Sequence, residues 1–300
     1  MRTWNDNRLV FFCSRSPDEI FSLGSGHSAS SSERPLILYA YKETENARQN
    51  LEFFIHQGLH GAADFVFILN GETDAAGWIP RADNVRIVER PNACYDLGAY
   101  GEVLREGGLW KKYKRFITLN ASIRGPFIPP WSDKCWSDAY LERLSDDVKL
   151  VGMTVNCGPT PHVQSMIWAT DQVGMELMLY PPPGASNPDM YGSDHDLVAY
   201  GGCYQDLVKA IHAEVGATAL IRGAGYNVSA MMAAFENPTY IDDCKLPVDP
   251  LYDRQYFGTN IHPYETIFTK ANRDIDPLLI DLMTKIHVSS QGGRSWDNCR

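Results

Sequence analysis

Short apolar runs alternate with amphipathic segments along the first half of the chain. Each run has the length of a buried strand, and the four runs cover residues 36–41, 65–69, 85–88 and 116–119. Helical spacing of apolar residues predicts a helix over 43–58, closed by Gly58, and a second over 96–106. Strands that alternate with helices predict an α/β fold with a mostly parallel sheet.

The second half has a less regular pattern. It predicts a strand over 149–153, an amphipathic helix within 164–180 and a helical region over 204–220. A proline-rich break at 181–184 separates the last two segments. Before the first strand, the stretch up to Ser32 is rich in glycine and serine, which is typical of a flexible tail.

Composition narrows the class of protein. A hydrophobic content of 44% over 300 residues is sufficient for a full core, and the formal net charge of -10 argues against non-specific binding of nucleic acid. No apolar run is long enough to span a membrane, since the one near the start covers only residues 9–13. We therefore expect a cytoplasmic protein.

The seven cysteines are odd in number and form no CxxC pair. This pattern disfavours a disulfide framework or a zinc site, so we expect reduced thiols, with one or two bridges left open as an alternative.

A polar triplet follows the fourth predicted strand. Asn120, Ala121 and Ser122 come directly after the strand and precede a Gly-Pro break. Open α/β sheets bind their ligands at the carboxyl ends of strands, although a simple turn would also use these residues. Neutral oxygens are weak ligands for Mg²⁺ or Mn²⁺. An anionic ligand here would therefore be neutralised by Arg124 or Lys270, or by a metal held elsewhere.

Two other strand ends carry candidate binding residues. Tyr41 follows the first strand, where its ring could stack on a nucleobase. Asp96 follows the third strand at a helix start, where its carboxylate could accept hydrogen bonds from sugar hydroxyls. The alternative for Asp96 is a helix N-cap, worth about 1 kcal/mol.

Later segments offer acid–base and metal-binding side chains. Asp206 and Glu214 are candidate general bases, with solvated charges on a helix face as the alternative. His262, Glu265 and Lys270 fall within nine residues, in a segment that could close over a bound ligand. A single histidine is more often structural, so this segment is the weaker candidate.

Taken in order, these motifs resemble those of glycosyltransferases of the GT-A type. The resemblance is strongest to a group of fungal and algal proteins related to the rhamnan-synthesis-F-like glycosyltransferases. It extends over about residues 35–275, and the pair NxxxDxGAY and LNxSxRGPF is its most specific part. The segments that carry it are 41–54, 65–74, 90–104, 116–127 and 262–273.

The resemblance implies a Rossmann-like domain and transfer of a sugar from a nucleotide-sugar donor to a hydroxyl acceptor. By position it places Asn70 and Asp96 in the donor site. Asn120 and Ser122 stand where most GT-A enzymes have an Asp-x-Asp metal motif, which leaves a requirement for Mn²⁺ or Mg²⁺ open. His262 resembles a carboxy-terminal histidine that often completes the metal site. Glu214 matches the acidic residue before the late helix, so it is preferred to Asp206 as the base.

These expectations divide the chain into four parts and leave three functions open. The functions are a glycosyltransferase, a catalytically inactive sugar- or nucleotide-binding protein, and a hydrolase on the same sheet. Many relatives look membrane-anchored and Golgi-facing, so the Golgi lumen is the alternative location. The parts are a flexible tail (1–34), a nucleotide-sugar-binding half (35–130), an acceptor-binding half with a closing segment (131–280) and a second tail (281–300).

Overall fold

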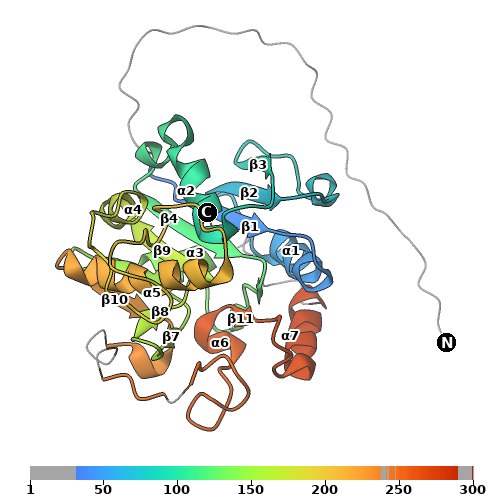
Figure 1. Cartoon of the computed structure of the whole chain (residues 1–300). Helices are drawn as coiled ribbons and strands as arrows, with labels where there is room; N and C mark the ends of the chain where they lie inside the picture. The colour runs from blue at the N-terminus through green and yellow to red at the C-terminus, as the bar shows by residue number, and fades with distance from the viewer. Residues whose placement is uncertain (1–31, 238–240, 242, 247, 290–298, 300) are drawn as a thin grey trace, which may run out of the picture. The chain divides into compact units, whose positions relative to one another are not determined.

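A seven-stranded sheet forms the centre of the fold in the computed structural model (Figure 1). The structure describes residues 32–237, 241, 243–246, 248–289 and 299. The strand order is β10-β6-β9-β4-β1-β2-β3. The strands are β1 (Leu36–Tyr41), β2 (Asp64–Asn70), β3 (Val85–Arg90), β4 (Arg115–Asn120), β6 (Val148–Gly152), β9 (Ile167–Asp171) and β10 (Asn227–Ala230).

Most neighbouring strands in this sheet are parallel. β3, β2, β1 and β4 form one parallel block, and β10 pairs in parallel with β6. β9 lies between β4 and β6 and runs antiparallel to both. The predicted α/β class with a mostly parallel sheet is therefore confirmed, and both halves of the chain contribute strands to the same sheet.

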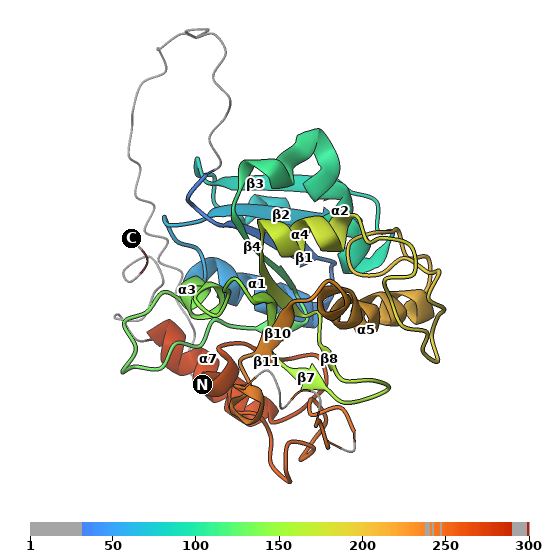
Figure 2. The same cartoon turned by 90° about the vertical axis from the view of Figure 1, so that its left-hand side faces the viewer.

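Helices cover both faces of the sheet (Figure 2). Alternate residues of β1 point to opposite faces, so Ile37 and Tyr39 pack in one core and Leu36 and Leu38 in the other. The helices α1 (Glu45–Gln57) and α3 (Trp136–Leu141) complete the first core. The second core is completed by α2 (Tyr95–Arg105), α4 (Gln172–Leu179) and α5 (Leu207–Gly223).

The predicted elements of the first half are confirmed to within about two residues. In the second half, the helix predicted within 164–180 is confirmed as α4, but strand β9, which precedes it in the same stretch, was not predicted. Ile167, Trp168 and Thr170 favour a strand because branched and aromatic side chains pack well on a pleated sheet. β9 pairs with both of its neighbours, and these contacts lie outside its own segment of sequence.

The carboxy-terminal segment returns to the first half of the chain. The two-residue strand β11 (Thr269–Lys270) pairs antiparallel with β5 (Ile123–Arg124). Helix α7 (Pro277–Ser289) then packs against α1, where Met283 forms a small hydrophobic cluster with Phe53 and Phe127. Residues 281–289, expected to lie in a tail, therefore belong to a packed helix. Other elements among the described residues are β7 (Val155–Asn156), β8 (His162–Val163), α6 (Pro263–Thr266) and the short 3-10 helices Ala75–Gly77, Glu106–Lys112 and Ala233–Phe235.

Six of the seven cysteines form three disulfides. The pairs are Cys94–Cys203, Cys135–Cys299 and Cys157–Cys244, separated in sequence by 109, 164 and 87 residues. The expectation of reduced thiols is therefore wrong, because separations this long leave no local signature in the sequence. Cys13 lies outside the described residues.

In the part of the chain that the structure describes, we find no helix with the length and hydropathy needed to cross a bilayer.

Candidate functional site

A cavity of about 750 Å³ opens at the carboxyl ends of three strands. Ala40 and Tyr41 at the end of β1, Asn70 at the end of β2 and Asn120 at the end of β4 line it. From β1 the chain proceeds to β2 and β3 on one side, whereas β4 lies on the other side of β1. The cavity therefore lies at the point where the strand order reverses, which is where open α/β sheets bind ligands.

Six of the seven residues predicted to bind a donor line this cavity, namely Tyr41, Asn70, Asp96, Asn120, Ser122 and Lys270. Four of them form a continuous hydrogen-bonded chain. The Lys270 ammonium donates to Ser122 Oγ at 2.8 Å, and Ser122 Oγ in turn donates to Asn120 Oδ1. Asn120 Nδ2 donates to Asp96 Oδ2. A cation and a carboxylate are thus held at opposite ends of two neutral side chains.

Burial shifts the protonation equilibria at both ends of this chain. Burial raises the pKa of Asp96; the hydrogen bond from Asn120 opposes the shift, and the negative charge of Glu214 adds to it. Burial and the charge of Arg273 lower the pKa of Lys270 to about 8, although three nearby carboxylates partly offset them. The pKa of Asp96 is thus raised and that of Lys270 lowered relative to free side chains, and perturbed pKa values of this kind are common at functional sites.

The position of Lys270 depends on the close approach of two distant segments. A Cβ at Gly125 would lie 2.7 Å from the carbonyl oxygen of Ile267, so a larger residue would push these segments apart. The amide of Phe127 donates to the same carbonyl at 2.7 Å. The amide of Ala271 donates to the carbonyl of Ser122 at 3.0 Å, which fixes the backbone next to Lys270 at the tip of β4.

The end of β1 forms a second polar wall. Tyr41 Oη donates to Glu43 Oε2 at 2.8 Å, and burial raises the pKa of Tyr41, so its hydroxyl stays protonated. Asn70 Nδ2 donates to the carbonyl of Tyr41 at 3.2 Å. Asn70 Oδ1 accepts from Arg90 Nη1 at 2.7 Å. These bonds hold Tyr41 and Asn70 in place at the cavity edge.

The opposite wall is cross-linked. Cys94 and Tyr95 lie at the start of α2 with left-handed backbone angles, φ 69° and 53°, which non-glycine residues seldom adopt. The disulfide from Cys94 reaches Cys203, and the residues after Cys203, Tyr204 and Gln205, line the cavity. Tyr95 remains 43% exposed, so its ring is available to a ligand. The bridge therefore joins two segments that form one wall.

Arg124 is the predicted donor residue that the structure does not bring to the cavity. Its side chain is buried against α1, where Nε donates to Asn50 Oδ1 at 2.8 Å and Nη2 donates to Gln49 Oε1 at 2.9 Å. Arg124 therefore has a structural role, and Lys270 is the candidate cation at the strand tip.

Glu214 lies behind the cavity without lining it. Its Oε2 accepts from Ser165 N at 2.7 Å and from Ser165 Oγ, and Oε1 lies 3.7 Å from His162 Nε2. Burial would raise its pKa, but the hydrogen bond and charge of His162 and the bonds from Ser165 lower it to about 2. Glu214 is therefore a fixed negative charge close enough to influence Asp96 and Lys270.

Asp206 and His262 both act as helix caps. Asp206 is exposed, and its Oδ1 accepts from Lys209 N at 2.9 Å at the start of α5. His262 is also exposed, and its Nδ1 accepts from Tyr264 N at 3.1 Å at the start of α6. Neither side chain lines the cavity. Asp206, a predicted base, and His262, a predicted metal ligand, thus have capping roles, although Gln205 and Leu207 on either side of Asp206 do line the cavity.

Sequence reasoning did not identify several other cavity residues. Asn46 could have been found, because Asn46 and Asn50 recur at helical spacing, and Asn50 Nδ2 donates to Ala121 O at 2.8 Å. Tyr204 gave no signal, since it reaches the cavity through tertiary packing and the Cys94 bridge. The residues missed include Thr44, Asn46, Tyr204, Gln205, Leu207 and Asn272.

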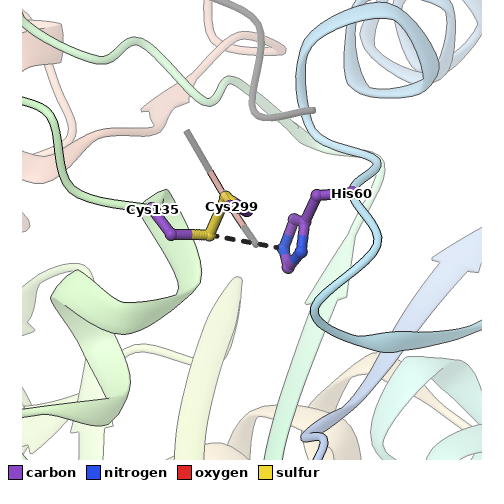
Figure 3. Close-up of side chains that lie close together, drawn as sticks. All are labelled: His60, Cys135 and Cys299. Atoms are coloured by element: carbon purple, nitrogen blue, oxygen red, sulfur yellow. Dashed lines mark hydrogen bonds between the residues drawn. A yellow bond between two sulfur atoms is a disulfide. The ribbon is translucent and has the colours of Figure 1, made fainter. Parts of the chain in front are cut away.

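A histidine lies beside one of the disulfides, outside the cavity (Figure 3). His60 Nε2 is 3.6 Å from Cys135 Sγ, and Cys135 is bonded to Cys299. Burial and the charge of Arg34 lower the pKa of His60 to about 4, so its imidazole is neutral at physiological pH. These three residues are the only metal-ligating group found among the described residues, but both sulfurs are already bonded to each other.

No protein-family model matches the chain, and no curated protein matches its sequence. Solved structures with partial similarity include the mannosyltransferase PcManGT from Pyrobaculum calidifontis in complex with GDP-Man and Mn²⁺, at 13% identity and a TM-score of 0.36. They also include a cytidylyltransferase from Leptospira borgpetersenii, at 13% identity and a TM-score of 0.31. A third is a glycosyltransferase involved in glycosylation of the major capsid of PBCV-1, at 10% identity and a TM-score of 0.30.

The matches cover only part of each protein. The match to the mannosyltransferase covers 57% of this chain and 52% of that protein. The match to the cytidylyltransferase covers 49% of this chain and 63% of that protein. The match to the capsid glycosyltransferase covers 48% of this chain and 62% of that protein. Similarity at these TM-scores supports no conclusion about function. The function is therefore inferred from the residues of the cavity.

Proposed function

We propose that the chain is a glycosyltransferase that moves a sugar from a nucleotide-sugar donor to a hydroxyl acceptor in this cavity. The observation that carries the proposal is the hydrogen-bonded chain from Lys270 to Asp96 at the strand-reversal point. An ammonium at one end suits a diphosphate, and a carboxylate at the other suits sugar hydroxyls. Tyr95, which lines the cavity and is 43% exposed, supplies an aromatic ring for the nucleobase, whereas the ring of Tyr41 is buried.

The carboxylate that lines the cavity is the best-placed general base. A base must come within hydrogen-bond reach of the acceptor hydroxyl, and its pKa should approach the working pH. Asp96 is the carboxylate that lines the cavity, and burial raises its pKa above that of a free side chain. Glu214, preferred on sequence grounds, has a pKa near 2 and accepts bonds from Ser165, so it suits a supporting charge better.

Binding of the donor is tested first. Thermal unfolding would be followed with UDP-, GDP- and dTDP-sugars, with Mn²⁺ and with EDTA. A donor at 100 times its Kd adds about 2.7 kcal/mol to the free energy of unfolding, which raises Tm by several degrees in a chain of this size. No shift with any donor would contradict the proposed function.

Turnover is tested with two matched variants, Asp96→Asn and Glu214→Gln. We expect Asp96→Asn to lower kcat by about a hundredfold or more while donor binding persists, because general-base catalysis contributes roughly 10²–10⁴-fold. Full loss in Glu214→Gln with an active Asp96→Asn would return the base to Glu214. Donor binding without turnover across a broad acceptor set would indicate a binding protein, and acceptor-independent consumption of donor would indicate a hydrolase.

A further inference from the structure

The cavity has few ligands for a divalent cation. Asp96 is the one carboxylate among the described residues that line it, and both of its oxygens already accept hydrogen bonds, from Leu97 N at 3.0 Å and from Asn120 Nδ2. The other polar side chains at the tip of β4 are an amide and a hydroxyl. Mg²⁺ and Mn²⁺ in proteins favour carboxylate oxygens, so the donor set fits neither ion well.

A positive charge already occupies this strand tip. The Lys270 ammonium lies 2.8 Å from Ser122 Oγ and is half-buried. A divalent cation bound at Ser122 would be repelled by this ammonium. An ammonium has three N–H donors, and Ser122 takes one of them, so two remain for phosphate oxygens.

The ammonium is held by a fixed backbone. Lys270 pairs with Ile123 across β11 and β5, and Ala271 N donates to Ser122 O at 3.0 Å. Asn46 Nδ2 donates to Ala271 O at 2.7 Å, which ties the same segment to α1. A charge held in place before the ligand arrives stabilises developing negative charge without a reorganisation cost.

Resting on the glycosyl-transfer function proposed above, we propose that the Lys270 ammonium, positioned by Ser122, takes the place of a divalent cation at the donor diphosphate. Donor binding and transfer then need no metal ion. In the transfer step the bond from the anomeric carbon to the diphosphate oxygen breaks, and its electron pair stays on that oxygen, beside Lys270. The acceptor oxygen forms the new bond to the anomeric carbon, and its proton passes to the Asp96 carboxylate.

Calorimetric titration with UDP, GDP and dTDP, in EDTA and in Mn²⁺, tests the proposal on the full chain. We expect one of these diphosphates to bind equally well in both conditions. Lys270→Met should weaken that binding by roughly tenfold to a hundredfold, since a hydrogen bond to a charged group has this worth. Lys270→Arg keeps the charge and should retain most of the affinity. Lys285→Met removes an exposed lysine on α7, outside the cavity, and should bind as the native chain does.

The outcomes separate this proposal from the general function. Binding and transfer that appear only with Mn²⁺ would overturn the role of Lys270 and leave the glycosyltransferase standing. Undiminished diphosphate binding by Lys270→Met in EDTA would also overturn the role of Lys270 and leave the glycosyltransferase standing. Binding of none of the three diphosphates would overturn both. The thermal unfolding curve of Lys270→Met shows whether a loss of binding reflects a loss of fold, and the charge-retaining Lys270→Arg supplies the decisive comparison if it does.

Discussion

Lys270 shows how one residue can be predicted by type and yet be positioned only by the tertiary structure. Its distance in sequence from the strand tips gave no reason, apart from the family resemblance, to place it beside Ser122. The contact depends on the pairing of β11 with β5 and on the missing side chain at Gly125. Asn120 and Ser122, in contrast, were predictable because they directly follow a strand of a parallel sheet. Arg124 follows the same strand, but its side chain turns toward α1.

The pKa of Lys270 makes donor binding depend on pH. Burial lowers this pKa to about 8, so the side chain is a cation below pH 8 and loses its charge above it. Since the proposed diphosphate site uses this cation, we expect the diphosphate Kd, measured between pH 7 and pH 9, to rise as the pH passes 8. Titrations across this range check the prediction. Lys270→Arg stays charged, so a rise of equal size in that variant would assign the effect to another group.

The elements that form the cavity edge were the best predicted, and those that brace them were not. β1, β2, β4 and α1 follow from short apolar runs and helical spacing, which are local properties of the sequence. β9 was not predicted and most of α7 was expected to lie in a tail, because β9 is stabilised by two neighbouring strands and α7 by its packing on α1. Where contacts with distant segments determine whether an element forms, the residues of that element alone are not enough to predict it.

Arg124 links three of these elements, and we expect Arg124→Met to lower stability without lowering donor affinity. Its guanidinium bonds to Asn50 and Gln49 on α1 and, at 3.5 Å, to Thr284 on α7. Of these partners Asn50 is the buried one, and leaving it unsatisfied costs about 1–3 kcal/mol, so Tm should fall by a few degrees. Calorimetric unfolding and diphosphate titration measure the two effects. Lost affinity at an unchanged Tm would instead place Arg124 in the donor site.

At the scale of the whole molecule, three disulfides change the expected setting of the protein. Disulfides form and persist in oxidising compartments, so we expect the chain to fold in such a compartment, in contrast to the cytoplasmic location expected from its sequence. The cysteines were misjudged because long-range pairing cannot be deduced from spacing. Peptide mapping of unreduced protein should recover Cys94, Cys135 and Cys157 each linked to its partner.

The Cys94–Cys203 and Cys157–Cys244 bridges should differ in their effect on function. Each closes a long loop, of 109 and 87 residues, so replacing either pair by serines should cost about 2–4 kcal/mol in the free energy of unfolding. Only Cys94 lines the cavity, so only Cys94→Ser/Cys203→Ser should also weaken diphosphate binding. Calorimetry on the two double variants measures both quantities. Equal losses of affinity would mean that the cavity responds to global stability and not to its cross-linked wall.

The order of the bridges along the chain has a consequence for biosynthesis. Of the six paired cysteines, the first bonds to the fourth, the second to the sixth and the third to the fifth. No cysteine bonds to its neighbour in sequence, so thiols oxidised in their order of emergence from the ribosome would be mispaired. Native pairing then requires thiol–disulfide exchange through mixed intermediates, which is slow without a catalyst. Recombinant yield should therefore follow the supply of a disulfide isomerase more closely than the supply of oxidant.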